Sequence, residues 1–329
     1  YVATGGYTAL KKALMMSPEE VVNVVKDAEL RGRGGAGFPC GVKWTFLPEP
    51  DGKTRYLCVN CDEAEPGTFK DRILVDFDPH SVIEGMAITC YACKLDISYF
   101  FIRGEWSQQA KIMQHAIDEA YENGIFGSQG LMNGASDFAV ECTQHRSAGA
   151  YICGEETALL EAVEGKRGWP RVKPPFPAVK GLFGRPTIIN NVETLAAIPL
   201  IVERGVDWWK SLGCTSSIGG SASYGLKLMG VSGHVNNPDV FEVELGIPLR
   251  TLVEQHAGGM RDGRRFKGAI AGGVSMGILG TDQYDAEMDF DIGKKYGVMG
   301  LGTACPTIFD EDTDMVSVAR NIARFFKNE

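Results

Sequence analysis

A glycine-rich loop near the N-terminus has the composition of a binding site. Residues 31–38 read Arg-Gly-Arg-Gly-Gly-Ala-Gly-Phe, in which Gly32, Gly34 and Gly37 have the spacing Gly-x-Gly-x-x-Gly. Glycines let backbone N–H groups approach a phosphate or a flat ring closely. The dinucleotide-binding fingerprint needs a strand before the loop and a helix after it, whereas here a predicted helix precedes the loop and Pro39 follows it. A standard Rossmann loop is therefore disfavoured, and a tight turn after a helix is the alternative.

Acidic residues follow a short apolar segment. Residues 55–60 (Arg-Tyr-Leu-Cys-Val-Asn) predict a strand, and Asp62, Glu63 and Glu65 come soon after it. Ligands of open parallel sheets bind beyond the carboxyl ends of the strands. Carboxylates at this place would repel a phosphate, but they could bind ribose or ribityl hydroxyls or lie near a ring nitrogen. A solvated acidic turn is the alternative.

Two further segments place polar side chains at the starts of predicted helices. Residues 154–157 (Gly-Glu-Glu-Thr) put two carboxylates in a first helical turn, where the helix dipole stabilises them. Residues 190–194 (Asn-Asn-Val-Glu-Thr) put two amides just before a helix. Asparagine caps are common, and helix N-termini also bind phosphate. Each segment is therefore compatible with plain capping or with a ligand site.

The nine cysteines raise the question of metal binding. Cys58 with Cys61 and Cys90 with Cys93 each have the spacing Cys-x-x-Cys. The first pair lies on a predicted strand, so its side chains point to different faces, and the gap to the second pair exceeds that of a zinc ribbon. Buried, reduced cysteines are the favoured interpretation, and a zinc or iron–sulfur site is the alternative. No Gly-x-Ser-x-Gly motif is present, which disfavours a hydrolase.

Composition and charge exclude several classes of protein. The 329 residues, 44% of them hydrophobic, predict about two globular domains. A net charge of -9 argues against a nucleic-acid partner. No apolar run approaches the ~18 residues that cross a bilayer, and no export signal occurs, so we expect no direct membrane insertion. The chain begins at Tyr1 and stops inside a predicted helix, which we interpret as a piece of a longer polypeptide.

Helices and strands alternate in the first two thirds of the chain, which predicts a mainly parallel sheet. Helices are predicted over 17–30, 79–94, 107–123, 155–164 and 192–204, and strands over 55–60, 97–103 and 139–143. Residues 169–186, with five prolines, are predicted to be extended. We interpret residues 213–223 as a linker and the segment after it as a small α+β module.

Five of these segments together resemble the NADH-binding flavoprotein subunit of respiratory complex I. This family of 51 kDa subunits includes the diaphorase beta subunits of NAD-linked hydrogenases and formate dehydrogenases. The matching segments are 31–39 with Lys43 and Trp44, 60–67, 149–158, 173–177 and 190–194. The resemblance continues more loosely through a soluble-ligand-binding β-grasp module at about 222–308.

The resemblance implies an α/β fold with three parts. These are a Rossmann-like parallel-sheet domain for FMN and NADH (1–212), a small ubiquitin-like β-grasp domain (213–308) and the start of a truncated C-terminal helical iron–sulfur domain (309–329). A 4Fe-4S cluster is expected in the full-length subunit, with its cysteine ligands beyond residue 329.

The resemblance also implies which residues bind an FMN and an NADH in one cavity. Glycines, a lysine, amides, carboxylates and a hydroxyl would contact FMN: Gly32, Gly34, Lys43, Asn60, Asp62, Glu63, Glu65, Gly154, Glu155, Asn190, Asn191 and Thr194. The NADH adenine would lie between the rings of Phe38, Phe46 and Phe176. Polar contacts to NADH would come from Glu65, Tyr151, Glu156 and Lys173, and we take Glu65 and Glu156 as the catalytic candidates. Ala64 replaces a common serine, which puts one flavin contact in doubt, and Cys61 replaces a common alanine.

The implied activity is that of an NADH:acceptor oxidoreductase. Hydride would pass between nicotinamide C4 and flavin N5, and single electrons would pass to iron–sulfur clusters of a multi-subunit complex. The implied partners are NADH/NAD⁺, a thioredoxin-like 2Fe-2S subunit and further iron–sulfur subunits. We expect a cytoplasmic location, including a peripheral position on the cytoplasmic side of a membrane complex.

Two alternatives remain open at the level of the sequence. The same module could run toward NAD⁺ reduction in a formate dehydrogenase, a hydrogenase or an electron-bifurcating complex, because hydride transfer on a flavin is reversible. A non-catalytic scaffold, in which the β-grasp module binds a ligand or a partner, is the alternative from another class.

Overall fold

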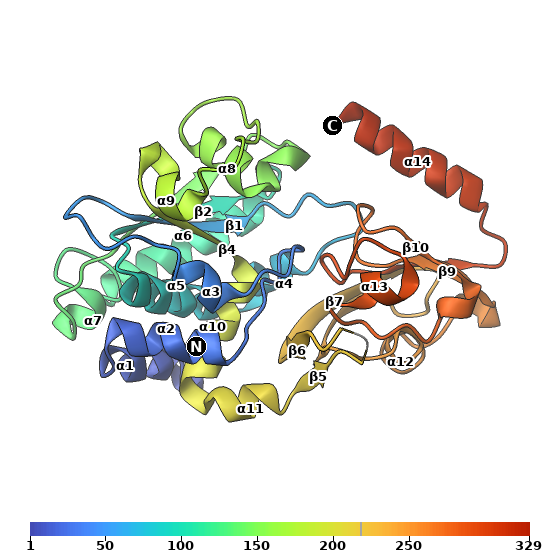
Figure 1. The fold of residues 1–329 in the computed structure, drawn as a ribbon, viewed down its shortest axis with the longest axis horizontal. Coiled ribbons are helices and arrows are strands. Elements are labelled where there is room, and N and C mark those ends of the chain that lie inside the picture. Colours follow the sequence, from blue (N-terminus) through green and yellow to red (C-terminus); the bar gives the residue numbers. More distant parts are fainter. Residues whose placement is uncertain (218) are drawn as a thin grey trace. The chain divides into compact units, whose positions relative to one another are not determined.

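The computed structural model describes residues 1–217 and 219–329 (Figure 1). The chain divides into two compact units, each formed by several segments. The first unit consists of Tyr1–Gly34, Phe38–Ala64 and Asp71–Trp209, and the second of Gly35–Gly37, Glu65–Lys70 and Lys210–Glu329.

The first unit is built on a four-stranded sheet in which every neighbouring pair is parallel. Its strands are β1 (Tyr56–Cys61), β2 (Ile97–Ile102), β3 (Glu141–Arg146) and β4 (Thr187–Asn191), in the order β3-β2-β1-β4. The predicted parallel α/β sheet is confirmed. Strand β3 lies further along the chain than the predicted strand 139–143.

One face of this sheet packs against α8 (Glu156–Val163). Side chains alternate along a strand, so Cys58 of β1 points to this face and contacts a cluster that includes Ile189 of β4 and Leu160 of α8. These side chains are almost fully buried. The helix therefore covers the central strands on this face.

Helices α5 (Pro79–Cys93) and α10 (Val192–Arg204) pack against each other on the opposite face (Figure 1). Helix α5 is apolar almost all round, which is typical of a buried helix. The two helices approach closely at Gly85, where an added Cβ would lie 2.0 Å from the carbonyl oxygen of Leu195. Glycine is thus required at the crossing of these helices.

Further helices complete the first unit. They are α1 (Thr8–Leu14), α2 (Pro18–Asp27), α3 (Cys40–Trp44), α4 (Asp71–Phe77), α6 (Ser107–Glu122), α7 (Leu131–Gly134), α9 (Pro177–Lys180) and α11 (Val206–Lys210). Helix α2 begins at a capping box, in which Ser17 and Glu20 bond reciprocally.

Residues 151–154, just before α8, form a 3₁₀-helix, Tyr151–Gly154. Two local predictions were wrong. The proline-rich stretch is not extended throughout, because α9 has a proline at its first position, where a missing N–H is harmless, and a 3₁₀ turn follows at Leu182–Gly184. The predicted linker contains two paired antiparallel strands, β5 (Gly213–Thr215) and β6 (Ala222–Tyr224), although residue 218 lies outside the described residues.

The second unit contains a mixed five-stranded sheet with the order β10-β9-β11-β7-β8. Its strands are β7 (Leu226–Gly233), β8 (Asp239–Glu244), β9 (Phe266–Ile270), β10 (Ile278–Leu279) and β11 (Thr307–Asp310). Strands β7 and β8 form an antiparallel hairpin, and β11 pairs parallel with β7 and antiparallel with β9. The expected β-grasp-like module is confirmed.

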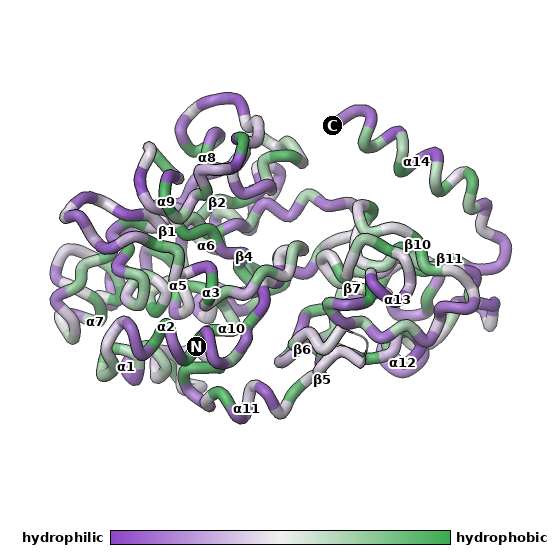
Figure 2. The backbone as a smooth tube through the Cα atoms, in the orientation of Figure 1, coloured by the Kyte–Doolittle hydropathy of each residue, from purple (hydrophilic) through white to green (hydrophobic). Residues whose placement is uncertain are grey.

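Helical segments accompany this second sheet. They are α12 (Leu249–Thr251), which continues as a π-helical turn over Leu252–His256, then α13 (Ile292–Tyr296) and α14 (Met315–Asn328). Hydrophobic and hydrophilic residues alternate along α14 (Figure 2). Within the described ranges, no helix is long and apolar enough to cross a membrane.

The crossing of α5 and α10 generates a stability prediction. Gly85→Ala should lower the free energy of unfolding by about 2–3 kcal/mol, because the methyl group would overlap the Leu195 carbonyl and overpack the core. Alanine is the better helix former by about 1 kcal/mol, so a loss cannot come from helix propensity. Urea denaturation measures the change.

Ala92→Gly on the same helix calibrates that propensity, with an expected loss of about 1 kcal/mol and no clash. A Gly85→Ala variant as stable as the parent protein would contradict the close approach of the two helices.

Candidate functional site

The carboxyl ends of β1 and β4 bring two of the predicted amides together. Asn60 and Asn191 are register partners in the parallel pairing of these strands. The Asn60 Nδ2 donates to the carbonyl oxygen of Gly154 at 2.8 Å, and its Oδ1 accepts the Asp62 N–H at 3.1 Å. Asn60 therefore ties the end of β1 to the 3₁₀-helix that precedes α8.

Asp62 is buried and has one carboxylate oxygen without a partner. The Ser147 hydroxyl donates to its Oδ2 at 2.9 Å, whereas Oδ1 is buried and has no hydrogen-bond partner among the described residues. Burial raises the pKa of Asp62 to about 6, the charge of Glu105 adds to the rise, and the bond from Ser147 opposes it. A buried acceptor in this state is poised to receive a donor from a ligand.

The glycine loop lies against the start of α10. A Cβ at Gly34 would lie 3.0 Å from the Asn191 Cβ, and the backbone N–H of Arg33 donates to the Thr194 hydroxyl at 2.8 Å. Asn191 caps α10 by accepting the Glu193 N–H at 3.0 Å. The loop and the helix N-terminus together offer backbone donors and a positive dipole end, which suit a phosphate.

Other predicted FMN residues are engaged in structural contacts. Lys43 Nζ donates to the Ile189 carbonyl oxygen at 2.9 Å. The Asn190 side chain is buried, where it accepts from Trp44 Nε1 at 3.2 Å and donates to Cys40 Sγ at 3.4 Å. These bonds hold α3 against β4, and the predicted contacts of Lys43 and Asn190 to FMN stay predictions.

The acidic residues after β1 take different partners. Glu63 accepts the backbone N–H of Asp71 at 2.9 Å, so it caps the start of α4. Glu65 belongs to the second unit, where its Oε1 accepts the backbone N–H and the hydroxyl of Ser275 at 2.7 and 2.6 Å. Their predicted ligand contacts stay predictions.

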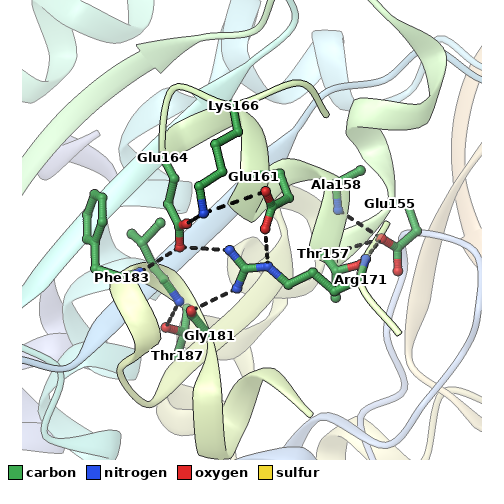
Figure 3. A network of polar contacts seen from close by, with 11 residues as sticks. Glu155, Thr157, Ala158, Glu161, Glu164, Lys166, Arg171, Gly181, Phe183 and Thr187 are labelled. Atoms are coloured by element: carbon green, nitrogen blue, oxygen red, sulfur yellow. Dashed lines mark hydrogen bonds and ion pairs between the residues drawn. The ribbon is translucent and has the colours of Figure 1, made fainter. Parts of the chain in front are cut away.

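Glu155 caps α8 and takes part in an ion pair. Its Oε2 accepts the backbone N–H groups of Thr157 and Ala158 at 2.7 and 2.9 Å (Figure 3). Burial alone would raise the pKa of Glu155, but these bonds and the bond from Lys173 lower it. Lys173 Nζ donates to Glu155 Oε1 at 3.1 Å and to Glu156 Oε1 at 2.8 Å. Three predicted residues are thus brought together.

The predicted aromatic residues are available for stacking. The exposed fractions of Phe38, Phe46 and Phe176 are 45%, 52% and 58%. The rings of Phe38 and Phe46 lie 6.1 Å apart between centroids. Exposed rings of this kind can stack on a flat ring of a ligand. Tyr151 is half-buried at the start of its 3₁₀-helix.

The sequence reasoning missed Ser147 and Arg171. Ser147 donates to the buried Asp62, and nothing in its local sequence pattern distinguishes it. Arg171 bonds to two carboxylates of α8, and its place two residues before Lys173 was the available signal.

Eight of the nine cysteines are buried thiols, and Cys214 is partly exposed. Burial raises the pKa of Cys40 and Cys142 to about 12, and raises that of Cys58 and Cys90 as well. Among the described residues, no group of three or more histidine, cysteine, aspartate or glutamate side chains is arranged to hold a metal ion.

The site therefore has the parts of a nucleotide-cofactor site in an α/β protein: a glycine loop, a helix N-terminus, amides and a buried carboxylate at the carboxyl ends of parallel strands. Residues 25–200 match the Nuo51 FMN-binding domain, and residues 228–279 match the SLBB domain. The chain belongs to the Nuo51 FMN-binding family. The predicted fold class and FMN cofactor are confirmed.

Several relatives resemble the whole chain. The F 2 subunit of the NADH-quinone oxidoreductase of Rhizobium meliloti is 51% identical over 330 residues, which cover 100% of this chain and 76% of the relative. The F subunit of the NADH-quinone oxidoreductase of Escherichia coli is 45% identical over 331 residues, which cover 100% of this chain and 72% of the relative.

A solved structure of similar fold is an NAD⁺-reducing [NiFe]-hydrogenase in the H₂-reduced state. It has a TM-score of 0.84 and 33% identity, and the similarity covers 98% of this chain and 52% of that chain. The chain thus spans about half the length of the hydrogenase chain that it matches.

The residues present fit FMN in chemistry. The glycine at position 34 is needed beside Asn191, because a Cβ there would already be tight against the Asn191 side chain. The unpartnered Oδ1 of Asp62 suits a ribityl hydroxyl or a ring N–H as a donor. Both observations concern the first unit alone.

The raised pKa of Asp62 generates a prediction about stability and pH. The folded pKa of about 6 lies above the unfolded value of 3.8, so the native state binds more protons and the free energy of unfolding falls as the pH rises through this window. Asp62→Asn should remove this loss. Its stability relative to the parent protein should improve by about 1–2 kcal/mol between pH 4.5 and pH 8.

Asp51→Asn is the matched control. Arg185 lowers the pKa of Asp51 from its usual 3.8, so this variant should lose relative stability only as the pH rises through the acid range around and below that value, and its relative stability should stay nearly constant between pH 4.5 and pH 8. Urea denaturation of the FMN-free chain at several pH values measures the free energy of unfolding of each variant relative to the parent protein. A difference for Asp62→Asn that does not change with pH would contradict the raised pKa of the buried Asp62 carboxyl.

Proposed function

We propose that this chain is the NADH-oxidising flavoprotein module of a multi-subunit redox complex, an NADH:acceptor oxidoreductase. The observation that carries the proposal is the similarity over the whole chain to the F subunits of NADH-quinone oxidoreductases, at 44–51% identity for relatives that include two from Rhizobium meliloti. The FMN-binding family match supplies the cofactor.

FMN, when bound, can accept a hydride and release electrons one at a time. The residues of this chain bind and orient it. The glycine loop and the start of α10 offer N–H donors to the phosphate, and the Asn60 amide fixes the segment that faces the ring and ribityl chain. Asp62 offers Oδ1 as an acceptor to a ribityl hydroxyl or a ring N–H, and burial raises the pKa of its carboxyl to about 6.

The nucleotide would be bound by charge and stacking. Lys173 stays protonated, because Glu155 and Glu156 raise its pKa although burial alone would lower it. A protonated lysine at this place can neutralise a diphosphate. The exposed ring of Phe176, with those of Phe38 and Phe46, offers surface for an adenine.

We also propose Glu65 and Glu156 as the acids of the reacting centre, with Tyr151 as a further polar contact. The ion pair of Glu156 with Lys173 supports this for Glu156. The bond to Ser275 holds the Glu65 carboxylate in one orientation. No side chain has to act as a nucleophile.

The proposal extends to partners and location. The relatives are named as subunits, which supports membership of a larger assembly with iron–sulfur partners, among them a thioredoxin-like 2Fe-2S subunit. The 4Fe-4S cluster of the full-length subunit would be the first acceptor. A peripheral, cytoplasmic position follows from the same assembly.

A second direction of electron flow has its own support. The similar solved structure is an NAD⁺-reducing hydrogenase, in which the product is NADH. The same residues serve either direction, since holding the nicotinamide against the flavin favours the forward and reverse steps alike.

The purified chain tests the proposal directly. It should bind FMN at one per chain, with flavin absorbance bands, and should oxidise NADH with ferricyanide as acceptor, because the proposed chemistry resides in this module. Stoichiometric FMN without NADH oxidation would leave a flavin-binding scaffold, and the oxidoreductase proposal would fail.

Phe176→Ala tests the stacking surface. Loss of the ring should raise the KM for NADH about 10-fold while the FMN content stays unchanged, because aromatic stacking is worth on the order of 1 kcal/mol and burial of the ring adds to it. Steady-state kinetics with ferricyanide measures the change.

Phe183→Ala is the matched control, because this ring is 50% exposed but packs edge-on against Tyr56. It should leave the KM unchanged. An equal KM for the Phe176→Ala variant and the parent protein would refute the stacking role.

A further inference from the structure

The segment between α8 and α9 carries two proposed nucleotide contacts but has little backbone support. Lys173 and Phe176 lie in it, and residues 170–177 include four prolines. Residues 170–175 make no backbone-to-backbone hydrogen bond within the described structure. Proline has no N–H, so a segment of this composition cannot be fixed by a ladder of main-chain bonds. Its position must come from side chains.

Arg171 supplies the side-chain bonds that fix this segment (Figure 3). Its Nε bonds to Glu161 Oε1 at 2.5 Å and its NH2 to Glu164 Oε1 at 2.7 Å, both on or at the end of α8. Its NH1 donates to the Gly181 carbonyl oxygen at 2.9 Å, just after α9. One guanidinium thus joins α8 to the far end of the segment.

The backbone of Arg171 adds a link to the other end of α8. Its N–H donates to the Thr157 hydroxyl at 2.8 Å, and that hydroxyl bonds in turn to Glu155 Oε2. Glu155 is one of the two carboxylates paired with Lys173. The contacts of Arg171 therefore lead directly to the ion pair of the proposed nucleotide site.

The charges around Arg171 keep its bonds to Glu161, Glu164 and Gly181 formed, and we call these three bonds the Arg171 clamp. Burial alone would lower the pKa of Arg171, but Glu164 and Glu161 raise it, so the guanidinium stays charged. Lys166 and Arg171 lower the pKa of Glu164 although burial opposes them, and that carboxylate also accepts the Phe183 N–H at 2.8 Å. A partly buried guanidinium that bridges two carboxylates is held more strongly than one side of an exposed ion pair.

We propose that Arg171 is a positioning residue for nucleotide binding. It holds the proline-rich segment at a fixed distance from α8, and so presents Lys173 and Phe176 in one arrangement before NADH arrives. This inference rests on the proposed function. The proposed role of Arg171 needs no contact with the nucleotide, since one donor on each of its three nitrogens bonds to Glu161, Gly181 or Glu164.

The shape of the guanidinium gives the proposal its chemical specificity. A planar fork with five donors can bond two carboxylates and a carbonyl at once, whereas a lysine ammonium is a point charge on a flexible stem. Arg171→Lys should therefore keep the charge but form only some of the bonds to Glu161, Glu164 and Gly181. Arg171→Gln should lose both the charge and the geometry.

The test uses the FMN-loaded chain with NADH and ferricyanide. Arg171→Gln should raise the KM for NADH about 10-fold, while kcat stays within about twofold and FMN remains at the parent content. The side chain of Arg171 bonds to none of the proposed flavin contacts, and its link to Glu155 starts from the backbone N–H, which each variant keeps. Arg171→Lys should give an intermediate KM. This order of KM values at constant FMN content distinguishes positioning from general destabilisation.

Lys166→Gln is the matched control, because Lys166 pairs with the same Glu164 but is exposed and makes no bond to the segment. It should leave KM unchanged. Its Nζ lies 3.8 Å from Glu161 Oε2, so its removal leaves the bond from Arg171 to Glu161 in place.

Equal KM values for Arg171→Gln and the parent protein would overturn the proposal, as would a fall of kcat and FMN content with KM unchanged. If Arg171→Gln does not fold, Arg171→Lys decides: a KM equal to that of the parent protein overturns the clamp. If the parent protein binds FMN but does not oxidise NADH, the proposed function fails instead. The parent protein is therefore assayed before the variants.

Discussion

The parallel register between β1 and β4 is the constraint on which the candidate flavin site depends. Pairing of Tyr56 with Thr187 at one end places Asn60 opposite Asn191 at the other. A slip of one residue would turn every side chain of one strand to the opposite face. It would separate Asn60, which bonds to Gly154 before α8, from Asn191, which caps α10. The glycine loop would then no longer pack against Asn191 at Gly34.

The polar groups at the carboxyl ends of β1 and β4 lower the free energy of unfolding where they lack partners. The sheet is buried on both faces, so the polar groups at its carboxyl ends must find partners in the protein or in a ligand. Asn60, Asn191 and Ser147 find them in the chain, whereas Asp62 keeps an unpartnered buried oxygen and a raised pKa. Stored cost of this kind concentrates at functional sites, because the ligand relieves it.

The sequence predicted the long elements well and the irregular ones poorly. The helix predicted over 79–94 spans Pro79–Cys93, and the helix predicted over 192–204 is α10, Val192–Arg204. Their apolar patterns and caps are local signals. The 3₁₀-helix at Tyr151–Gly154 and the bond from Ser147 to Asp62 depend on tertiary contacts, across 85 residues in the second case, and short-range patterns do not carry that information.

The proposed flavin contacts and the proposed nucleotide contacts are held by different kinds of interaction. This difference suits two ligands with different residence times on the protein. The proposed flavin contacts lie on strand ends, on a helix N-terminus and on a loop packed against it, all fixed by main-chain hydrogen bonds and a dry core. Lys173 and Phe176 lie instead on a proline-rich segment that side-chain ion pairs hold to α8. Elements fixed by main-chain hydrogen bonds separate only when the domain unfolds. A segment held by a few ion pairs can move locally, at a smaller free-energy cost. A cofactor that must stay through every turnover belongs on the former, and a nucleotide that must enter and leave belongs on the latter.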